Sequence, residues 1–350
     1  MELFMPDKDQ KNESFSSASE ANGTPLHKMC DFRAGVSGPY HLINTNMVTE
    51  NSTNKKLSGR GGANFLLSPL YCGSEVTGWR ATGKYMGGRM NLATAMAISG
   101  AAADPHGAPG GEGLTRNRSV SLLMALFNVR LGYWAPNPAP EHKAMFTNSP
   151  NWLVHGLREM FGFGLNETGR YVHIADGGHY ENLALYELIR RRLKTIIVCD
   201  GGADPDYTFD DFANFVEKVR VDFGADIKMP SFLTMCPSPD VDASGNKKNP
   251  YGVDLAEKGY VTGRISYCDG TFGKLIYIKT TLIGKLPKDI YGYKSAHPEF
   301  PDETTADQFF DEKQFEAYRE LGYRIGKSMM NDTGLKKRFA GLKQVRPETT

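Results

Sequence analysis

Residues 170–192 read RYVHIADGGHYENLALYELIRRR, and this stretch decides the expected fold. The residues from Tyr171 to Ile174 have the composition of a β-strand, and Asp176-Gly177-Gly178 is typical of a tight turn. From Glu181 onward the apolar residues keep the spacing of a helix. The stretch therefore predicts a strand, a turn and a helix in succession.

A second strand is predicted directly after this helix, at residues 195–199, and it also ends in Asp-Gly-Gly, at residues 200–202. Strand, helix and strand with short joints form a βαβ unit whose strands are parallel and whose crossover is right-handed. In sheets of this kind, binding sites form at the carboxyl ends of the strands. Asp176 and Asp200 would both lie there.

Two interpretations of Asp176 follow from its setting. In the first, its side chain caps the following turn while Gly177 and Gly178 supply positive φ. In the second, it is a catalytic carboxylate at the end of a central strand, with its side chain pointing into a cleft. For Asp200 a cap of the loop before Asp204 is the preferred interpretation.

The motif around Asp176 resembles the aspartate motif of the patatin-like and cytosolic phospholipase A2-like acyl hydrolases, in which Asp-Gly-Gly or Asp-Gly-Ala follows a strand. The resemblance continues through Glu181-Asn182-Leu183, the arginine run at 190–192 and Val221-Asp222-Phe223-Gly224. It covers about residues 35–330. It implies an α/β fold with a central, mostly parallel sheet flanked by helices and a β-hairpin elaboration. The implied activity is lipid acyl ester hydrolysis of the phospholipase A type by a Ser–Asp dyad, with Asp176 as the general base and no cofactor.

The nucleophile of such a dyad has no clear match in this sequence. The segment Gly35–Pro39 half resembles the G-x-S-x-G elbow, but a polar segment precedes it and a strand pattern follows, so a structural turn is expected there. Ser99 is the one serine worth testing, although Ala97 and Ala101 stand where the elbow needs glycines. No segment matches the family's glycine-rich oxyanion loop. The resemblance therefore implies that the first half of the domain is missing and that this chain alone is inactive.

Binding residues are expected around the turn and on two aromatic loops. Gly177 and Gly178 belong to the motif itself. Tyr71 and Trp79 lie in a segment of Ser-Pro and Cys-Gly-Ser turns, where they could line an acyl or head-group cleft or simply cover the sheet. The expected partner is a phospholipid or another acyl ester, together with a peripheral membrane contact.

Composition narrows the remaining classes. With 41 basic and 40 acidic residues the net charge is +1, so no nucleic-acid partner is expected. The 5 cysteines form no CxxC pair and have no metal-ligand spacing with the 8 histidines, so no metal site is expected. No run of about 18 apolar residues and no secretory signal is present, which favours a cytoplasmic or peripheral membrane protein.

The chain is expected to divide into a disordered lead-in at residues 1–30, the acyl hydrolase portion at 31–330 and a frayed tail at 331–350. Within the middle portion, the patterns predict helices at residues 91–97, 119–131, 152–163 and 209–223 and a hairpin of strands 260–267 and 274–281.

Two other functions remain open at this point. The first is a non-catalytic relative that binds lipid or protein, which the absent elbow favours. The second is a metal-dependent hydrolase in which Asp176, His179, Asp200 and Asp204 act as ligands.

Overall fold

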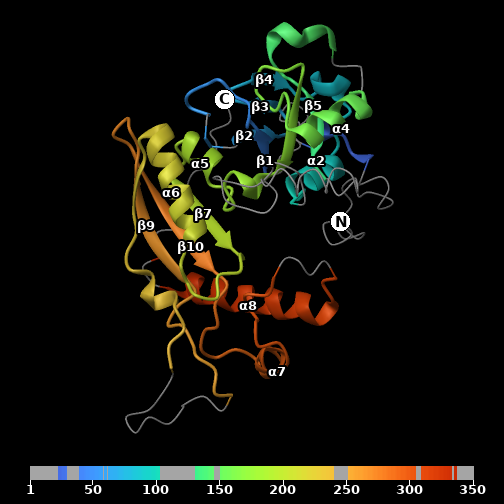
Figure 1. Ribbon diagram of the computed structural model, residues 1–350. Helices are drawn as coiled ribbons and strands as arrows, with labels where there is room; N and C mark the ends of the chain where they lie inside the picture. Colours follow the sequence, from blue (N-terminus) through green and yellow to red (C-terminus); the bar gives the residue numbers. More distant parts are fainter. Residues whose placement is uncertain are drawn as a thin grey trace. The chain divides into compact units, whose positions relative to one another are not determined.

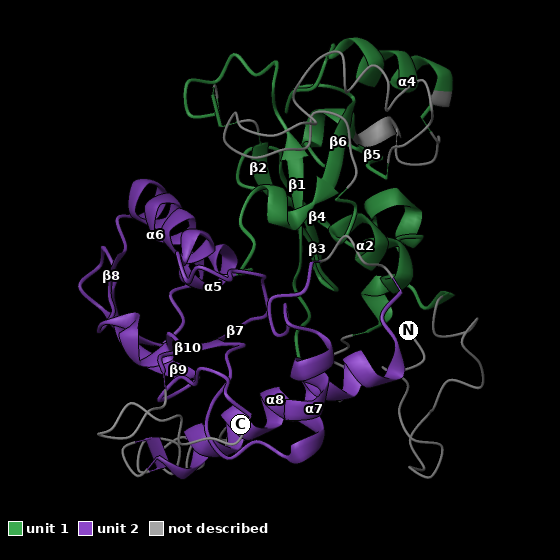
Figure 2. Cartoon of the chain, turned by 60° about the horizontal axis from the view of Figure 1, so that its bottom comes forward, with its two compact units in different colours: residues 1–184 green, residues 185–350 purple. Residues whose placement is uncertain are grey.

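A computed structural model describes residues 23–29, 39–57, 59–60, 62–102, 131–145, 150–239, 251–304, 309–332 and 335–336. The chain forms two compact units, residues 1–184 and residues 185–350 (Figure 2). The elbow-like segment at 35–38 and most of the predicted helix at 119–131, of the lead-in and of the tail lie outside the described residues.

The described part of the first unit is built on a six-stranded sheet in the order β4-β3-β2-β1-β6-β5 (Figure 1). Every pairing in this sheet is antiparallel. The central strand β1 is buried at five of its six residues and packs through Met47 and Ile43 into the main core cluster. The strands are β1 (Ile43–Val48), β2 (Gly62–Leu67), β3 (Tyr71–Ser74), β4 (Gly78–Ala81), β5 (Tyr133–Pro136) and β6 (Tyr171–Asp176).

Two α-helices of the first unit follow their predicted positions. Helix α2 (Leu92–Ser99) begins at Asn91, whose side chain accepts the N–H of Thr94, and packs on β1 and β6 (Figure 1). Helix α4 (Trp152–Phe161) begins at Asn151 and ends at Gly162, which takes the left-handed conformation. Four short 3-10 segments complete the described helices of this unit: η2 (Leu26–Lys28), η3 (Tyr85–Gly88), η5 (Pro140–Met145) and η6 (Gly177–His179).

Helix α4 turns its polar residues inward. His155 and Glu159 are buried, and Glu159 accepts a hydrogen bond of 2.5 Å from Nε1 of Trp134. Leu153, Leu157 and Phe161 are exposed. The amphipathic pattern predicted the helix, but hydrogen bonding of a buried carboxylate and indole, rather than apolar burial, decides which face lies inside.

The second unit contains a mixed four-stranded sheet in the order β7-β10-β9-β8. Strands β7 and β10 are parallel, and the other pairs are antiparallel. The predicted hairpin is confirmed as β9 and β10, and the predicted helix at 209–223 is confirmed as α6. The elements are β7 (Thr195–Asp200), β8 (Asp226–Lys228), β9 (Tyr260–Ser266), β10 (Phe272–Lys279), α5 (Tyr186–Arg190), α6 (Asp210–Phe223), η7 (Phe232–Met235), α7 (Lys288–Ala296) and α8 (Glu312–Asn331).

Opposite faces of this second sheet receive different helices. Phe212 of α6 packs edge-on against Tyr277 of β10, with ring centroids 5.2 Å apart. Ile276, the preceding residue of β10, clusters with Met329 of α8. Because successive strand residues point to opposite faces, α6 covers one face and the end of α8 covers part of the other.

The expected central, mostly parallel sheet flanked by helices is wrong. Strand β6, which carries Asp176, lies antiparallel between β1 and β5, and β7 belongs to the other sheet. After β6 the chain forms η6 and reaches an α-helix only at α5. Five helical residues rise about 7 Å, whereas a six-residue strand is about 20 Å long. Helix α5 is therefore too short to run back along β6 and bring β7 beside it.

Among the described helices, none combines the length and the apolar composition that crossing a bilayer requires.

Candidate functional site

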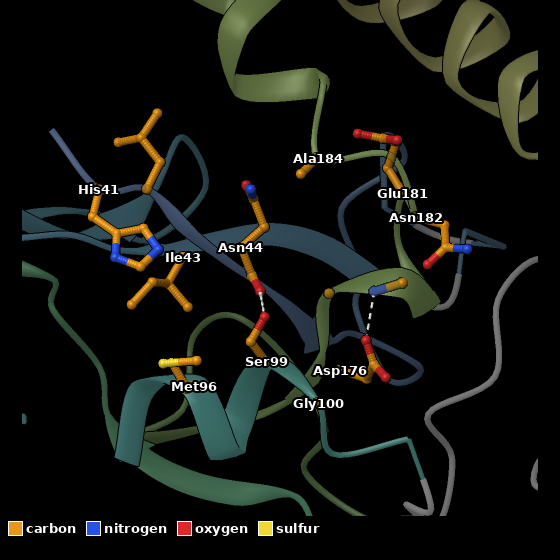
Figure 3. Close-up of a pocket in the computed structure, with 13 residues that line it drawn as sticks. His41, Ile43, Asn44, Met96, Ser99, Gly100, Asp176, Glu181, Asn182 and Ala184 are labelled. Atoms are coloured by element: carbon orange, nitrogen blue, oxygen red, sulfur yellow. Dashed lines mark hydrogen bonds between the residues drawn. The ribbon is translucent and has the colours of Figure 1, made fainter. Parts of the chain in front are cut away.

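A pocket of about 380 Å³ lies in the first unit, where the segment before β1, the end of α2 and the turn after β6 meet (Figure 3). Ser99 and Asp176 both line it, although 77 positions separate them in the chain. The lining residues are His41, Leu42, Ile43, Asn44, Met96, Ser99, Gly100, Asp176, Gly177, Gly178, Glu181, Asn182 and Ala184.

Asp176 is the last residue of β6, and its side chain both caps the following turn and lines the pocket. Its Oδ1 accepts the N–H of Gly178 at 2.7 Å and so caps η6 (Figure 3). Its side chain is partly exposed and lines the pocket. The cap fixes the direction of the carboxylate, because a hydrogen bond to one oxygen restricts rotation of the group.

Gly177 and Gly178 are needed for close approach rather than for positive φ, which neither adopts. A Cβ on Gly177 would lie 2.6 Å from the carbonyl oxygen of Asn44, and one on Gly178 would lie 2.8 Å from Oδ1 of Asn182. Contacts this short force neighbouring atoms to move. Gly177 therefore lets the turn press against the start of β1, which brings Asp176 to the pocket, and Gly178 leaves room for the side chain of Asn182.

Ser99 is the last residue of α2, and its hydroxyl donates to the carbonyl oxygen of Asn44 at 2.7 Å (Figure 3). A helix, not a strand, precedes it, so Ser99 does not sit on the strand-to-helix elbow of serine hydrolases. The acceptor of this bond belongs to β1 rather than to the same helix. This bond ties the end of α2 to the strand beside Asp176.

His41 and Glu181 also line the pocket, and sequence reasoning missed both. Desolvation lowers the pKa of His41, although its side chain is exposed, and this favours the neutral ring. Glu181 is buried and accepts the N–H of Leu183 at 2.6 Å. No lysine or arginine lines the pocket among the described residues. Glu181 could have been suspected from its place five residues after Asp176, whereas His41 has no motif around it.

Tyr71 and Trp79 do not line this pocket. Tyr71 opens β3 and is exposed, and Trp79 pairs with Gly73 across β3 and β4. The aromatic loops of the prediction are strands, and β4 is an edge of the sheet.

The four ligands of the metal-hydrolase hypothesis fall in different units. Asp176 and His179 belong to the first unit, and Asp200 and Asp204 belong to the second. The ammonium group of Lys279 lies 3.6 Å from Asp200 and 3.8 Å from Asp204; Lys279 and Asp200 are buried, and Asp204 is partly exposed. A buried cation already balances the charge of these carboxylates, so they are poorly suited to bind a divalent metal ion.

The described residues bring together one other set of metal-ligand side chains, His297, Glu299 and Glu303, whose ligand atoms lie within 4.8 Å of one another. Oε1 of Glu303 also accepts the hydroxyl of Tyr293 at 2.9 Å. This cluster is far in sequence from the Asp176 motif and belongs to the second unit.

Comparison with known proteins assigns no family, since no protein-family model, no curated protein and no solved structure matches the chain. The function must therefore be argued from the pocket itself.

Proposed function

We propose that the Asp176 pocket hydrolyses an acyl ester, with Asp176 as the general base and Ser99 as the nucleophile. The observation that carries the proposal is that Ser99, the one hydroxyl side chain of the lining, and Asp176 line a single pocket. The proposal keeps the Ser–Asp pairing that the sequence resemblance implied and discards the fold that came with it.

The reaction would begin with rotation of the Ser99 side chain away from the carbonyl of Asn44. Its hydroxyl would then donate to Asp176, and Oγ would attack the ester carbonyl as the proton passes to the carboxylate. Collapse of the tetrahedral intermediate would release the alcohol with that proton and leave an acyl-Ser99. Attack by water, deprotonated by Asp176, would then break the bond between Oγ and the acyl group, release the carboxylic acid and return the proton to Ser99.

The lining favours a neutral or zwitterionic ester. Leu42, Ile43 and Met96 provide apolar contacts for an acyl chain, while Asp176 and Glu181 bring two carboxylates. A bare phosphate or carboxylate near Asp176 would be repelled, since no lysine or arginine among the described residues lines the pocket. A head group with a positive end would be attracted.

A fluorophosphonate probe tests the proposal, because it labels only an activated serine. The purified chain should be labelled at Ser99, and both Ser99→Ala and Asp176→Asn should lose the label. Ser295→Ala is the matched control, since the Ser295 hydroxyl also donates to a backbone carbonyl, at 2.9 Å. Labelling that survives in Asp176→Asn, or no labelling of the folded chain, would overturn the proposal.

A second candidate is lipid binding without catalysis. The observation in its favour is the bond from Ser99 to Asn44, which uses the hydroxyl hydrogen that the dyad would need. It predicts that a fluorescent fatty acid binds the chain, that Met96→Trp weakens this binding, and that the fluorophosphonate leaves Ser99 unlabelled.

A further inference from the structure

The mixed sheet of the second unit has one face that is only partly covered. Ile276 and Tyr260 lie on this face and are buried against Met329 and Leu335, at and beyond the end of α8. Two residues back along β10, on the same face, Lys274 is exposed. The face is therefore closed at one end and open at the other.

The open end is a hollow of about 760 Å³ that runs across all four strands. Among the described residues, four cations line it and no carboxylate does. We call it the basic face; its cations are Lys194, Lys228, Arg264 and Lys274. In the register of the sheet, Lys274 lies opposite Arg264, and Arg264 lies opposite Lys228, so three of the cations form a row across β10, β9 and β8. Like charges directly opposite one another destabilise a sheet, which leaves this row in need of an anion.

Asp226, the acidic residue closest to this row in register, neutralises little of its positive charge. Lys228 pairs with Asp226 at 3.7 Å, and both side chains are exposed. An exposed pair of this kind contributes little and is screened by salt. The charge of the whole chain is only +1, so the cations of the basic face are a local excess.

Exposed apolar side chains lie among the cations. Phe272 is 54% exposed, with the guanidinium of Arg264 3.8 Å from its ring centroid. Ile197 is 46% exposed and shares the face with Thr195, a lining residue two positions earlier on β7. Cations combined with exposed apolar groups are typical of surfaces that rest on a membrane, where the apolar groups enter between head groups.

We propose that the basic face docks the second unit on a membrane surface through anionic lipid head groups. Charge complementarity identifies the occupant: a row of lysines and an arginine with no lining carboxylate fits a layer of phosphate and carboxylate groups. Single-stranded nucleic acid fits less well, because it needs several stacking aromatic rings and the hollow has one, already covered by Arg264. This docking does not depend on ester hydrolysis at Asp176.

Sedimentation with lipid vesicles tests the proposal on the full chain. The chain should bind vesicles of phosphatidylcholine with phosphatidylserine and bind vesicles of phosphatidylcholine alone at least tenfold more weakly. Each cation held at an anionic surface contributes about fivefold to binding, so the triple variant K228E/R264E/K274E should bind at least tenfold less. Salt should weaken binding by the wild type, because exposed charges are screened.

A matched triple variant controls for the change in net charge. Lys258, Lys288 and Lys313 are exposed in the same unit and lie outside the hollow, so K258E/K288E/K313E should bind like the wild type. Phe272→Ser removes an apolar contact without changing charge and should lower binding several-fold. Equal loss in the two triple variants, binding without preference for anionic lipid, or binding of single-stranded RNA in place of vesicles would each overturn the proposal.

Discussion

The chain uses the same motif twice, and the two copies differ in what surrounds them. Asp176-Gly-Gly and Asp200-Gly-Gly each follow a strand, and each aspartate accepts the N–H of the second glycine, at 2.7 Å and 2.9 Å. Asp176 is partly exposed in a pocket that no lysine or arginine lines in the part of the chain that the structure describes. Asp200 is buried, accepts the hydroxyl of Tyr277 and faces the ammonium of Lys279.

This comparison separates what the motif encodes from what its environment adds. Asp-Gly-Gly encodes a capped turn at the end of a strand. Whether the carboxylate is reactive depends on distant residues: Ser99 and Asn44 near Asp176, and Lys279 near Asp200. We therefore expect chemistry at Asp176 and structural stabilisation at Asp200.

The largest effect on stability is expected from removing the cation at Asp200. Lys279→Met would leave the buried carboxylate of Asp200 without its counter-charge, which costs about 3–5 kcal/mol. Lys274→Met, on the exposed side of the same strand, should change stability by less than about 0.5 kcal/mol. Urea unfolding of both variants provides the measurement, and equal stabilities would contradict the structural role of the Lys279 pair.

The two motifs also differ in how tightly their first glycine is packed. A Cβ on Gly177 would meet the carbonyl oxygen of Asn44 at 2.6 Å, whereas a Cβ on Gly201 would meet no atom within 4 Å. Gly177→Ala should therefore cost about 1–3 kcal/mol, and Gly201→Ala should stay within about 0.5 kcal/mol of the wild type. A tolerated Gly177→Ala would show that the turn does not press on β1.

A smaller effect is expected from pH, and it should appear in the first unit. Burial lowers the pKa of His155 below its usual 6.5, and this outweighs the smaller opposing effects of the Asn151 carbonyl and Glu159. The unfolded chain then binds the proton first as pH falls. The free energy of unfolding that His155 contributes is therefore fully present above pH 6.5, and it decreases as pH falls below that value. Replacing His155 with Gln should flatten this part of a stability-against-pH curve, and an unchanged slope would contradict the assignment.

The sequence predicted the helices and strands better than it predicted which strands pair with one another. The strands predicted at 171–174 and 195–199, the helix at 209–223 and the hairpin of β9 and β10 follow local periodicity, and all are confirmed. The parallel pairing failed because pairing depends on residues far along the chain: β1 takes the place beside β6 that β7 was expected to fill.

Prediction of the candidate site was limited in the same way, because local patterns do not encode long-range packing. Asp176 and its glycines could be singled out from their spacing, and Ser99 from its small neighbours. That both line one pocket follows from the packing of α2 on β1 and β6, which no local pattern encodes. His41 enters the pocket from a segment without a motif.

The most direct test compares Asp176→Asn with Asp200→Asn in one experiment, measuring hydrolysis of a short-chain nitrophenyl ester and urea unfolding. If Asp176 is the general base, Asp176→Asn should lower turnover by about 10²- to 10⁴-fold. The same substitution should change stability little, because Asn also caps turns. Asp200→Asn should unfold at lower urea while the folded fraction keeps its turnover. Equal turnover of Asp176→Asn and the wild type would contradict the assignment of chemistry to Asp176.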